Sequence, residues 1–311
     1  MNTYKQIDQY KASKKAVVTI GTFDGVHHGH QQILQKVVDR AKTEDLTTVL
    51  LTFFPHPRMV LQPEYDLKLI NTINERVDLV AKTGVEHMII HPFSKEFSRT
   101  SAREYVKDIL VDQLNAAVVV IGYDHHYGRN RSANIDNLRQ DAEDYGFELI
   151  EITKEEIDEV AVSSTKIRSA INDGEIQIAN QYLGRAFSIH GSIVKGKQIG
   201  RTINYPTANL DVVEKYKLIP KMGVYITSSV INGKRVYGMT NIGKNPTVSD
   251  ADGSITIETF YIDFDKDLYG QEMELFFHKR LRDEAKFNSM DELKKIMATD
   301  EQKTRDYASN A

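Results

Sequence analysis

The spacing of hydrophobic and polar residues changes near the middle of this 311-residue chain. In the first half, short apolar runs alternate with longer segments in which apolar residues recur every three or four positions, as on one face of a helix. The apolar runs lie at residues 16–20, 47–53, 85–93, 116–122 and 147–153, and the periodic segments at residues 31–44, 71–84, 101–114 and 134–146. Apolar strands that alternate with amphipathic helices predict an α/β fold with a Rossmann-like parallel sheet covered on both faces.

The second half, from about residue 186, has a different pattern. Apolar and polar residues alternate within short segments, and glycine, Asn-Gly or Asp-Gly separates one segment from the next. The pair Asn232-Gly233 is typical of a two-residue β-hairpin. A long amphipathic segment follows at residues 289–308. This half predicts an antiparallel β-barrel with a C-terminal helix, and we expect domains at residues 1–184 and 185–311.

The most unusual stretch of the first half is "GTFDGVHHGH" at residues 21–30, which joins the first apolar run to the first periodic segment. A strand that enters a helix through a glycine-rich turn presents backbone N–H groups and the positive end of the helix dipole to a ligand. His27 and His30 are three positions apart, so we expect them on one side of the helix, with Gly29 leaving room between them. Imidazoles placed there can donate hydrogen bonds to charge that develops on a phosphate. The alternatives are exposed histidines or a chance metal site.

A second polar segment, "SSTKIR" at residues 163–168, suits the same kind of ligand. Ser164 or Thr165 can cap the following helix and donate a hydrogen bond to phosphate, and Arg168 adds a cation on that side. A simple helix cap followed by a surface arginine is the alternative.

Two further segments follow predicted strands, at the sheet edge where ligands of such folds bind. The stretch "TFFPHPRMVL" at residues 52–61 predicts a stiff aromatic corner suited to a flat ring, although core packing and a turn would explain it too. Its candidate ring-binding residues are Phe54, His56 and Pro57. Asp124 follows the fourth strand, where its carboxylate can accept a hydrogen bond from a ribose hydroxyl or an adenine amine.

In the second half, "GSIVKGKQIGRTINYPTANL" at residues 191–210 combines a glycine-rich run with a polar strand. Gly196 and Lys197 belong to the flexible part, which can fold over phosphates. Thr207 and Asn209 are two positions apart on an extended segment, so their side chains share one face. Their oxygen atoms suit Mg²⁺, which usually keeps waters and substrate phosphates among its ligands. Without the glycines, "PTAN" would indicate only a turn into a strand.

These motifs carry a family resemblance. Residues 21–30 resemble the signature of the nucleotidyltransferase superfamily, and residues 163–168 resemble its partner motif for the β- and γ-phosphates. The segments after the second and fourth strands resemble FAD synthetases (FMN adenylyltransferases), and residues 191–210 resemble riboflavin kinases. Over almost its whole length, the chain resembles bacterial bifunctional riboflavin kinase/FAD synthetases. It departs from the pattern at His125 and Tyr127, where Phe is familiar, and at Ala133 and Asn204, where glycine is usual.

The resemblance implies that the barrel phosphorylates riboflavin with ATP and Mg²⁺, and that the first domain transfers an adenylyl group from ATP to FMN, giving FAD and pyrophosphate. It implies that Glu258 is the general base and that Thr207 and Asn209 hold the metal and the phosphates. His27 and His30 would stabilise the α-phosphate. The other nucleotide-binding residues implied are Gly21, Phe23, Asp24, Gly29, Asp124, Ser164, Thr165, Arg168, Gly196 and Lys197. The flavin-binding residues implied are Phe54, His56, Pro57, Asn241 and Arg282.

Composition narrows the choice of partners. The formal net charge of −4 gives no overall attraction to nucleic acid or to an anionic membrane, so an anion site must be local. The absence of cysteine excludes disulfides and thiolate chemistry and suits a reducing cytoplasm, and we recognise no signal peptide or membrane-spanning run. We expect a cytoplasmic enzyme of small molecules without nucleic-acid or membrane partners, and weak or transient self-association stays open. Two rivals remain: a nucleotidyltransferase of another acceptor whose barrel only binds flavin, and a non-catalytic flavin or nucleotide sensor.

Overall fold

The computed structural model describes residues 1–122, 126–129, 132–153, 162–196, 205–244, 255–285, 287 and 289–311. The chain divides into two compact units, Met1–Ser164 and Thr165–Ala311. Helices α7 (Ser164–Asp173) and α8 (Ile176–Leu183) fall almost entirely in the second unit, whereas the predicted boundary after residue 184 assigns them to the first domain. The physical reason is that α8 packs on strands of the barrel, and Ile176 and Leu183 are buried there.

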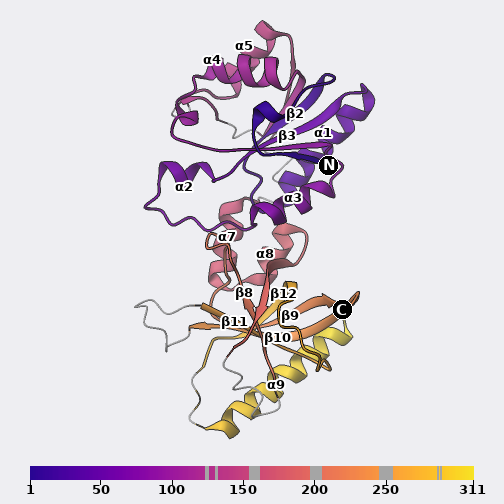
Figure 1. Cartoon of the computed structure of the whole chain (residues 1–311), viewed down its shortest axis with the longest axis vertical. Coiled ribbons are helices and arrows are strands. Elements are labelled where there is room, and N and C mark those ends of the chain that lie inside the picture. The colour runs from indigo at the N-terminus through magenta and orange to yellow at the C-terminus, as the bar shows by residue number, and fades with distance from the viewer. Residues whose placement is uncertain are drawn as a thin grey trace. The chain divides into compact units, whose positions relative to one another are not determined.

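The first unit contains a six-stranded parallel sheet with the strand order β1-β4-β3-β2-β5-β6 (Figure 1). Its strands are β1 (Asn2–Tyr4), β2 (Ala16–Ile20), β3 (Thr47–Phe53), β4 (His87–His91), β5 (Ala116–Gly122) and β6 (Glu148–Ile152). Its α-helices are α1 (His28–Thr43), α2 (Pro57–Leu61), α3 (Ile73–Ala81), α4 (Ala102–Glu104) and α5 (Ile135–Tyr145). The described residues of this unit also include the 3₁₀ segments η1 (Ile7–Gln9) and η2 (Phe97–Arg99) and the π-helical η3 (Tyr105–Gln113). The predicted parallel sheet is confirmed, and β1 is an additional edge strand.

Apolar side chains on both faces of this sheet explain why its strands are apolar throughout. On one face, Val17 of β2 belongs to the same buried cluster as Leu34 of α1. On the opposite face, Val18 lies in a second cluster with Leu110 of η3 and Leu138 of α5. Burying each such side chain contributes roughly 1.5–3 kcal/mol. The helices therefore hold a rigid sheet whose carboxyl edge carries the loops of interest.

The second unit contains a closed antiparallel barrel with the strand order β10-β11-β8-β7-β12-β9. Its strands are β7 (Phe187–Val194), β8 (Ala208–Asp211), β9 (Gly223–Ile231), β10 (Lys234–Lys244), β11 (Ile255–Tyr261) and β12 (Glu272–Arg282). The predicted hairpin is confirmed, with positive φ at both Asn232 (52°) and Gly233 (76°). The predicted C-terminal helix is α9 (Met290–Ser309), whose first turn is capped by the Ser289 side chain. It packs against β10.

Candidate active sites

The first candidate site is the loop between β2 and α1. Phe23, Gly25 and Val26 have positive φ angles of 48°, 93° and 40°. Left-handed backbone costs a branched residue such as Val26 roughly 1–3 kcal/mol, and such strain clusters at functional sites. A Cβ on Gly21 would lie 3.0 Å from the Phe23 ring, which is tighter than an ordinary contact, so a side chain there would press on that ring. Close packing within the loop therefore fixes its shape.

The two predicted histidines meet at the start of α1. His27 is the N-cap residue and His30 lies in the first turn, so both imidazoles are at the positive end of the helix dipole. Their rings stack, with centroids 3.7 Å apart and planes inclined by 18°. The Phe23 ring contacts His30 at a centroid distance of 4.9 Å, and Gly29 between the histidines is buried. The sequence spacing thus predicted the pairing of the side chains, while their role stays a prediction.

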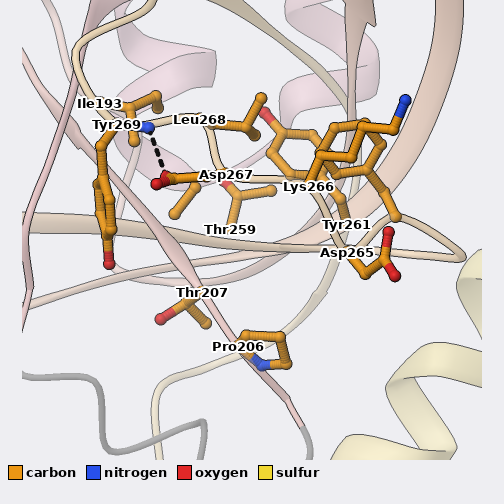
Figure 2. A pocket seen from close by; sticks show the side chains of 12 residues that line it. Ile193, Pro206, Thr207, Thr259, Tyr261, Asp265, Lys266, Asp267, Leu268 and Tyr269 are labelled. Atoms are coloured by element: carbon orange, nitrogen blue, oxygen red, sulfur yellow. Dashed lines mark hydrogen bonds between the residues drawn. The ribbon is translucent and has the colours of Figure 1, made fainter.

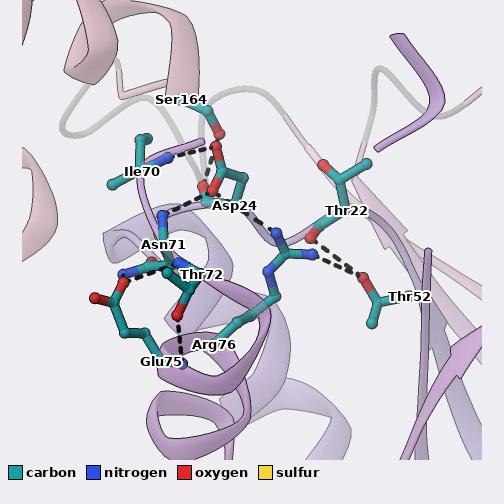
Figure 3. Close-up of polar contacts among 9 residues, drawn as sticks. All are labelled: Thr22, Asp24, Thr52, Ile70, Asn71, Thr72, Glu75, Arg76 and Ser164. Atoms are coloured by element: carbon teal, nitrogen blue, oxygen red, sulfur yellow. Dashed lines mark hydrogen bonds and ion pairs between the residues drawn. The ribbon is translucent and has the colours of Figure 1, made fainter. Parts of the chain in front are cut away.

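Asp24 anchors this loop to the start of α3 (Figure 3). Its carboxylate accepts hydrogen bonds from the backbone N–H groups of Ile70 and Asn71, both at 3.1 Å, and lies 3.8 Å from Arg76 Nη2. The side chains of Asp24 and Arg76 have no exposed surface. The Ser164 hydroxyl donates to the backbone carbonyl of Asp24 at 2.9 Å. A carboxylate held in this way positions the loop, and the predicted contact of Asp24 with a nucleotide stays a prediction.

The serine–threonine motif differs from its prediction in one respect. Ser164 and Thr165 are the first two residues of α7, so neither occupies the cap position before it. Ser164 instead ties the start of α7 to the histidine loop. Thr165 and Arg168 belong to the second unit, and their contact with phosphate stays a prediction. Asp124 and Lys197, and the departures at His125 and Asn204, lie outside the described residues.

The aromatic corner after β3 has the fixed shape that its prolines predict. The backbone N–H of Phe54 donates to the His91 carbonyl at 3.1 Å, so the sheet pairing continues beyond β3. His56 caps α2, since its Nδ1 accepts from the Arg58 N–H at 3.1 Å, and Pro57 occupies the first helical position. That these residues contact flavin stays a prediction.

Tyr127 and Ala133, two positions at which the chain departs from the family pattern, belong to the core. The two residues are buried and pair through backbone hydrogen bonds of 3.1 and 3.2 Å. The Tyr127 hydroxyl donates to Asp141 at 2.9 Å, and burial followed by this hydrogen bond raises the pKa of Tyr127. These two departures from the family pattern are therefore accommodated by packing.

The second candidate site lies on the barrel wall. Glu258 of β11 is paired in register with Asn209 of β8 on one side and with Asn241 of β10 on the other. Directly opposite residues of antiparallel strands project from the same face, so these side chains are neighbours. The Thr207 hydroxyl lies 3.4 Å from Glu258 Oε2. A Cβ on Gly196 would come 2.2 Å from the Asn209 side chain, so only glycine allows this approach. Strand register thus brings together Glu258, Asn209 and Asn241, and close contacts add Thr207 and Gly196 to them.

A pocket of about 170 Å³ adjoins Thr207 (Figure 2). One wall consists of Pro206, Thr207 and Ala208, and the facing wall is the loop at residues 264–269 between β11 and β12. Thr259, a neighbour of the candidate base in sequence, also lines it. Sequence reasoning missed this loop because "FDKDLY" carries no motif; its place directly after the strand that bears Glu258 was the available signal.

Strand pairing with Glu258 does not bring Arg282 to the barrel face that carries the candidate base. Its Nε donates to Asp300 Oδ2 of α9 at 2.8 Å, and its guanidinium lies 5.8 Å from the Phe287 ring centroid. The ion pair joins the end of β12 to α9, and the predicted flavin contact stays a prediction.

Comparison with known proteins agrees with this division of sites. Residues 9–166 match the FAD synthetase family, and residues 183–308 match the riboflavin kinase family. A bifunctional riboflavin kinase/FMN adenylyltransferase of Listeria monocytogenes is 38% identical over 292 residues, which are 94% of this chain and 92% of that protein. The chain belongs to the bifunctional riboflavin kinase/FMN adenylyltransferase family. The predicted resemblance is confirmed, and the family member of Escherichia coli is 31% identical over 94% of this chain and 92% of its own length.

Among solved structures, a protein named macrolide-efflux protein, from Streptococcus pneumoniae, has 31% identity and a TM-score of 0.88 over 98% of each chain. Its fold therefore matches this family member along both units. In the part of this chain that the structure describes, no helix is long and apolar enough to cross a membrane.

Proposed function

We propose that this chain phosphorylates riboflavin with ATP on the barrel and transfers the adenylyl group of a second ATP to FMN at the histidine loop. The observation that carries the proposal is the assembly of two separate sets of side chains, each within the segment that matches the corresponding family. Thr207, Asn209 and Glu258 form the kinase set, and His27 and His30 form the adenylyltransferase set.

In the kinase reaction, Glu258 takes the proton from the terminal ribityl hydroxyl of riboflavin as its oxygen attacks the γ-phosphorus of ATP. The bond from this phosphorus to the bridging oxygen breaks, and ADP leaves. A positioned general base of this kind contributes roughly 10²–10⁴-fold. The pocket beside Thr207 takes the nucleoside end of ATP, so its phosphates extend towards Thr207 and Glu258.

The same face fits Mg²⁺, because hydroxyl, amide and carboxylate oxygens meet there, and these are the donors that Mg²⁺ prefers. Thr207 and Asn209 would hold the ion. When bound, Mg²⁺ neutralises phosphate charge in a phosphoryl transfer.

In the adenylyltransferase reaction, a phosphate oxygen of FMN attacks the α-phosphorus of ATP, and pyrophosphate leaves. The reaction needs no nucleophile from the protein, so alignment and charge stabilisation are the whole task. His27 and His30 donate hydrogen bonds to the α-phosphate oxygens, and the N-terminus of α1 adds its dipole. Asp24 and Arg76 hold the loop in which this happens.

The test is to incubate the protein with riboflavin, ATP and Mg²⁺ and to separate riboflavin, FMN and FAD by chromatography. We expect FMN and then FAD. Formation of FAD from supplied FMN without any FMN from riboflavin would instead favour an adenylyltransferase whose barrel only binds flavin. Formation of neither product would favour a sensor. A cytoplasmic setting and the absence of nucleic-acid and membrane partners remain proposals from composition.

A further inference from the structure

Side chains of α9 form a continuous polar chain that reaches two other segments of the barrel unit. Arg305 donates two hydrogen bonds to the Asp263 carboxylate, from Nη1 to Oδ2 at 2.7 Å and from Nη2 to Oδ1 at 2.8 Å. Its Nε and Nη2 also donate to Glu301 Oε1, at 3.0 and 2.8 Å. The other oxygen of Glu301 accepts from the Tyr205 hydroxyl at 3.1 Å. One helix thereby connects Tyr205 to Asp263, which are far apart in sequence.

The two ends of this chain adjoin the two walls of the pocket. Tyr205 immediately precedes Pro206, and Asp263 immediately precedes Phe264, the first residues of the facing walls. The Tyr205 ring also packs edge-on against Phe260, two residues after the candidate base, with centroids 4.9 Å apart. Neither end residue lines the pocket itself, nor do the two α9 residues between them. The polar chain therefore spans the pocket from outside.

The chemistry of these contacts fixes the relative orientation of the side chains that they join. An arginine fork on a carboxylate fixes the relative orientation of both groups, which a lysine cannot do. Hydrogen bonds from Arg305 lower the pKa of Asp263, so this carboxylate is ionised near neutral pH. Burial and then the contact with Glu301 raise the pKa of Tyr205, so its hydroxyl remains a donor. Asp263 and Tyr205 thus keep the protonation states that the network needs.

We propose that Glu301 and Arg305 make α9 a clamp on the ATP pocket, in which they act as positioning residues that set the distance between its two walls. The inference rests on the proposed riboflavin kinase activity. Glu258 is held by strand pairing with Asn209 and contacts the Thr207 hydroxyl, so loosening the clamp leaves the chemical step in place. The loss appears in ATP binding, because Tyr205 directly precedes one wall of the pocket and Asp263 directly precedes the other.

The experiment measures riboflavin kinase kinetics of the full chain with Arg305→Ala, Arg305→Lys and Tyr205→Phe. Lys303→Ala removes an exposed cation of the same helix and is the matched control. We expect Arg305→Ala to raise KM for ATP about threefold to tenfold, with kcat within about twofold of the original. Arg305→Lys recovers part of the loss, since it keeps the charge without the fork. The double variant Arg305→Ala/Tyr205→Phe shows less than the product of the single effects, because both residues belong to one network.

Adenylylation of supplied FMN provides an internal control, and we expect it to be unchanged in every variant. An unchanged KM for ATP in Arg305→Ala would overturn the clamp while leaving the proposed function intact. The clamp would also be overturned if Arg305→Ala and Arg305→Lys lowered kcat and the unfolding temperature to the same extent and left KM unchanged. Such a result would indicate that Arg305 supports the fold in general. Failure of the unaltered protein to make FMN from riboflavin would overturn the proposed kinase function and the clamp with it.

Discussion

The histidine loop lies within residues 21–30, whereas the barrel site takes side chains from several strands that are distant in sequence. The loop offers backbone N–H groups, a helix dipole and two stacked imidazoles in a strained conformation. The barrel offers side-chain oxygens whose positions are set by strand register. The first site depends on what keeps its backbone in place, and the second on the pairing of strands.

The supports of the two sites differ in burial. Asp24 and Arg76 behind the loop have no exposed side-chain surface, whereas Asp263 and Arg305 beside the pocket have 74% and 40% exposed. Breaking a buried pair costs roughly 3–5 kcal/mol, while exposed pairs usually contribute about 1 kcal/mol or less. Loss of the Asp24–Arg76 pair should therefore abolish the function of the histidine loop, whereas loss of the Asp263–Arg305 pair should only weaken the barrel site.

The sharpest separation of the two sites comes from removing the candidate base. We expect Glu258→Gln to lower FMN formation from riboflavin by about 10²–10⁴-fold, because the amide cannot accept the hydroxyl proton. FAD formation from supplied FMN should be unchanged. Glu274→Gln, on an exposed position of β12, is the control and should retain both activities. Loss of both activities in Glu258→Gln would show that the two sites are not independent.

The complementary change acts on the loop. We expect His30→Ala to lower adenylyl transfer by about 10²–10³-fold, the usual loss when one transition-state donor is removed. FMN formation should be unchanged, so FMN accumulates in the coupled assay. His28→Ala alters the neighbouring imidazole of α1 and should have little effect. If His28→Ala were as damaging as His30→Ala, the assignment of the histidine pair would be wrong.

A third change tests the buried support. Asp24→Asn leaves an amide among the N–H donors of Ile70 and Asn71 and leaves Arg76 without its counter-charge. We expect it to destabilise the first unit by about 3 kcal/mol and to reduce adenylyl transfer, with kinase activity preserved. Denaturant unfolding followed together with both activities checks this. Asp39→Asn on the exposed face of α1 is the control, and equal stability of the two variants would contradict the positioning role.

The sequence predicted what local pattern determines. The strands of the parallel sheet are apolar runs, the barrel hairpin carries Asn232-Gly233, and the histidines follow helical spacing, so each appears in a short window. The edge strand β1 escaped prediction because its three residues form no apolar run, and its place depends on pairing with β4 and on packing of Tyr4 against Tyr10 and His87.

Long-range contacts could not be predicted in the same way. The partners of Asp24 lie more than forty positions downstream, so its burial, and hence its positioning role, follows only from the folded chain. The ion pair between Asp263 and Arg305 is likewise 42 positions apart, and that of Arg282 with Asp300 is 18 apart. The family resemblance supplied Glu258, Asn209 and Asn241 without this knowledge, but the strand register was needed to show that the three are direct neighbours.

The smallest expected effect concerns a histidine of the barrel unit that has no part in either proposed reaction. His278 shares a hydrogen bond of 2.8 Å with Ser228, and its ring contacts the rings of Tyr237 and Tyr307, which also contact each other. Burial, aided by the charge of Arg235, lowers the pKa of His278 from its ordinary 6.5 to about 4. Between these values His278 binds fewer protons in the folded protein than in the unfolded chain, so its contribution to stability is constant above about pH 6.5 and falls as the pH drops towards 4.

His278→Gln keeps a side chain that can bond Ser228 but removes the titration, so its unfolding temperature should decline less steeply over this pH window. His87 and His91 of the first unit also have lowered pKa values through burial, but they are common to both proteins and cancel in the comparison. Thermal unfolding of both proteins from neutral pH to about pH 4 measures the difference. Parallel curves would mean that His278 does not couple protonation to barrel stability.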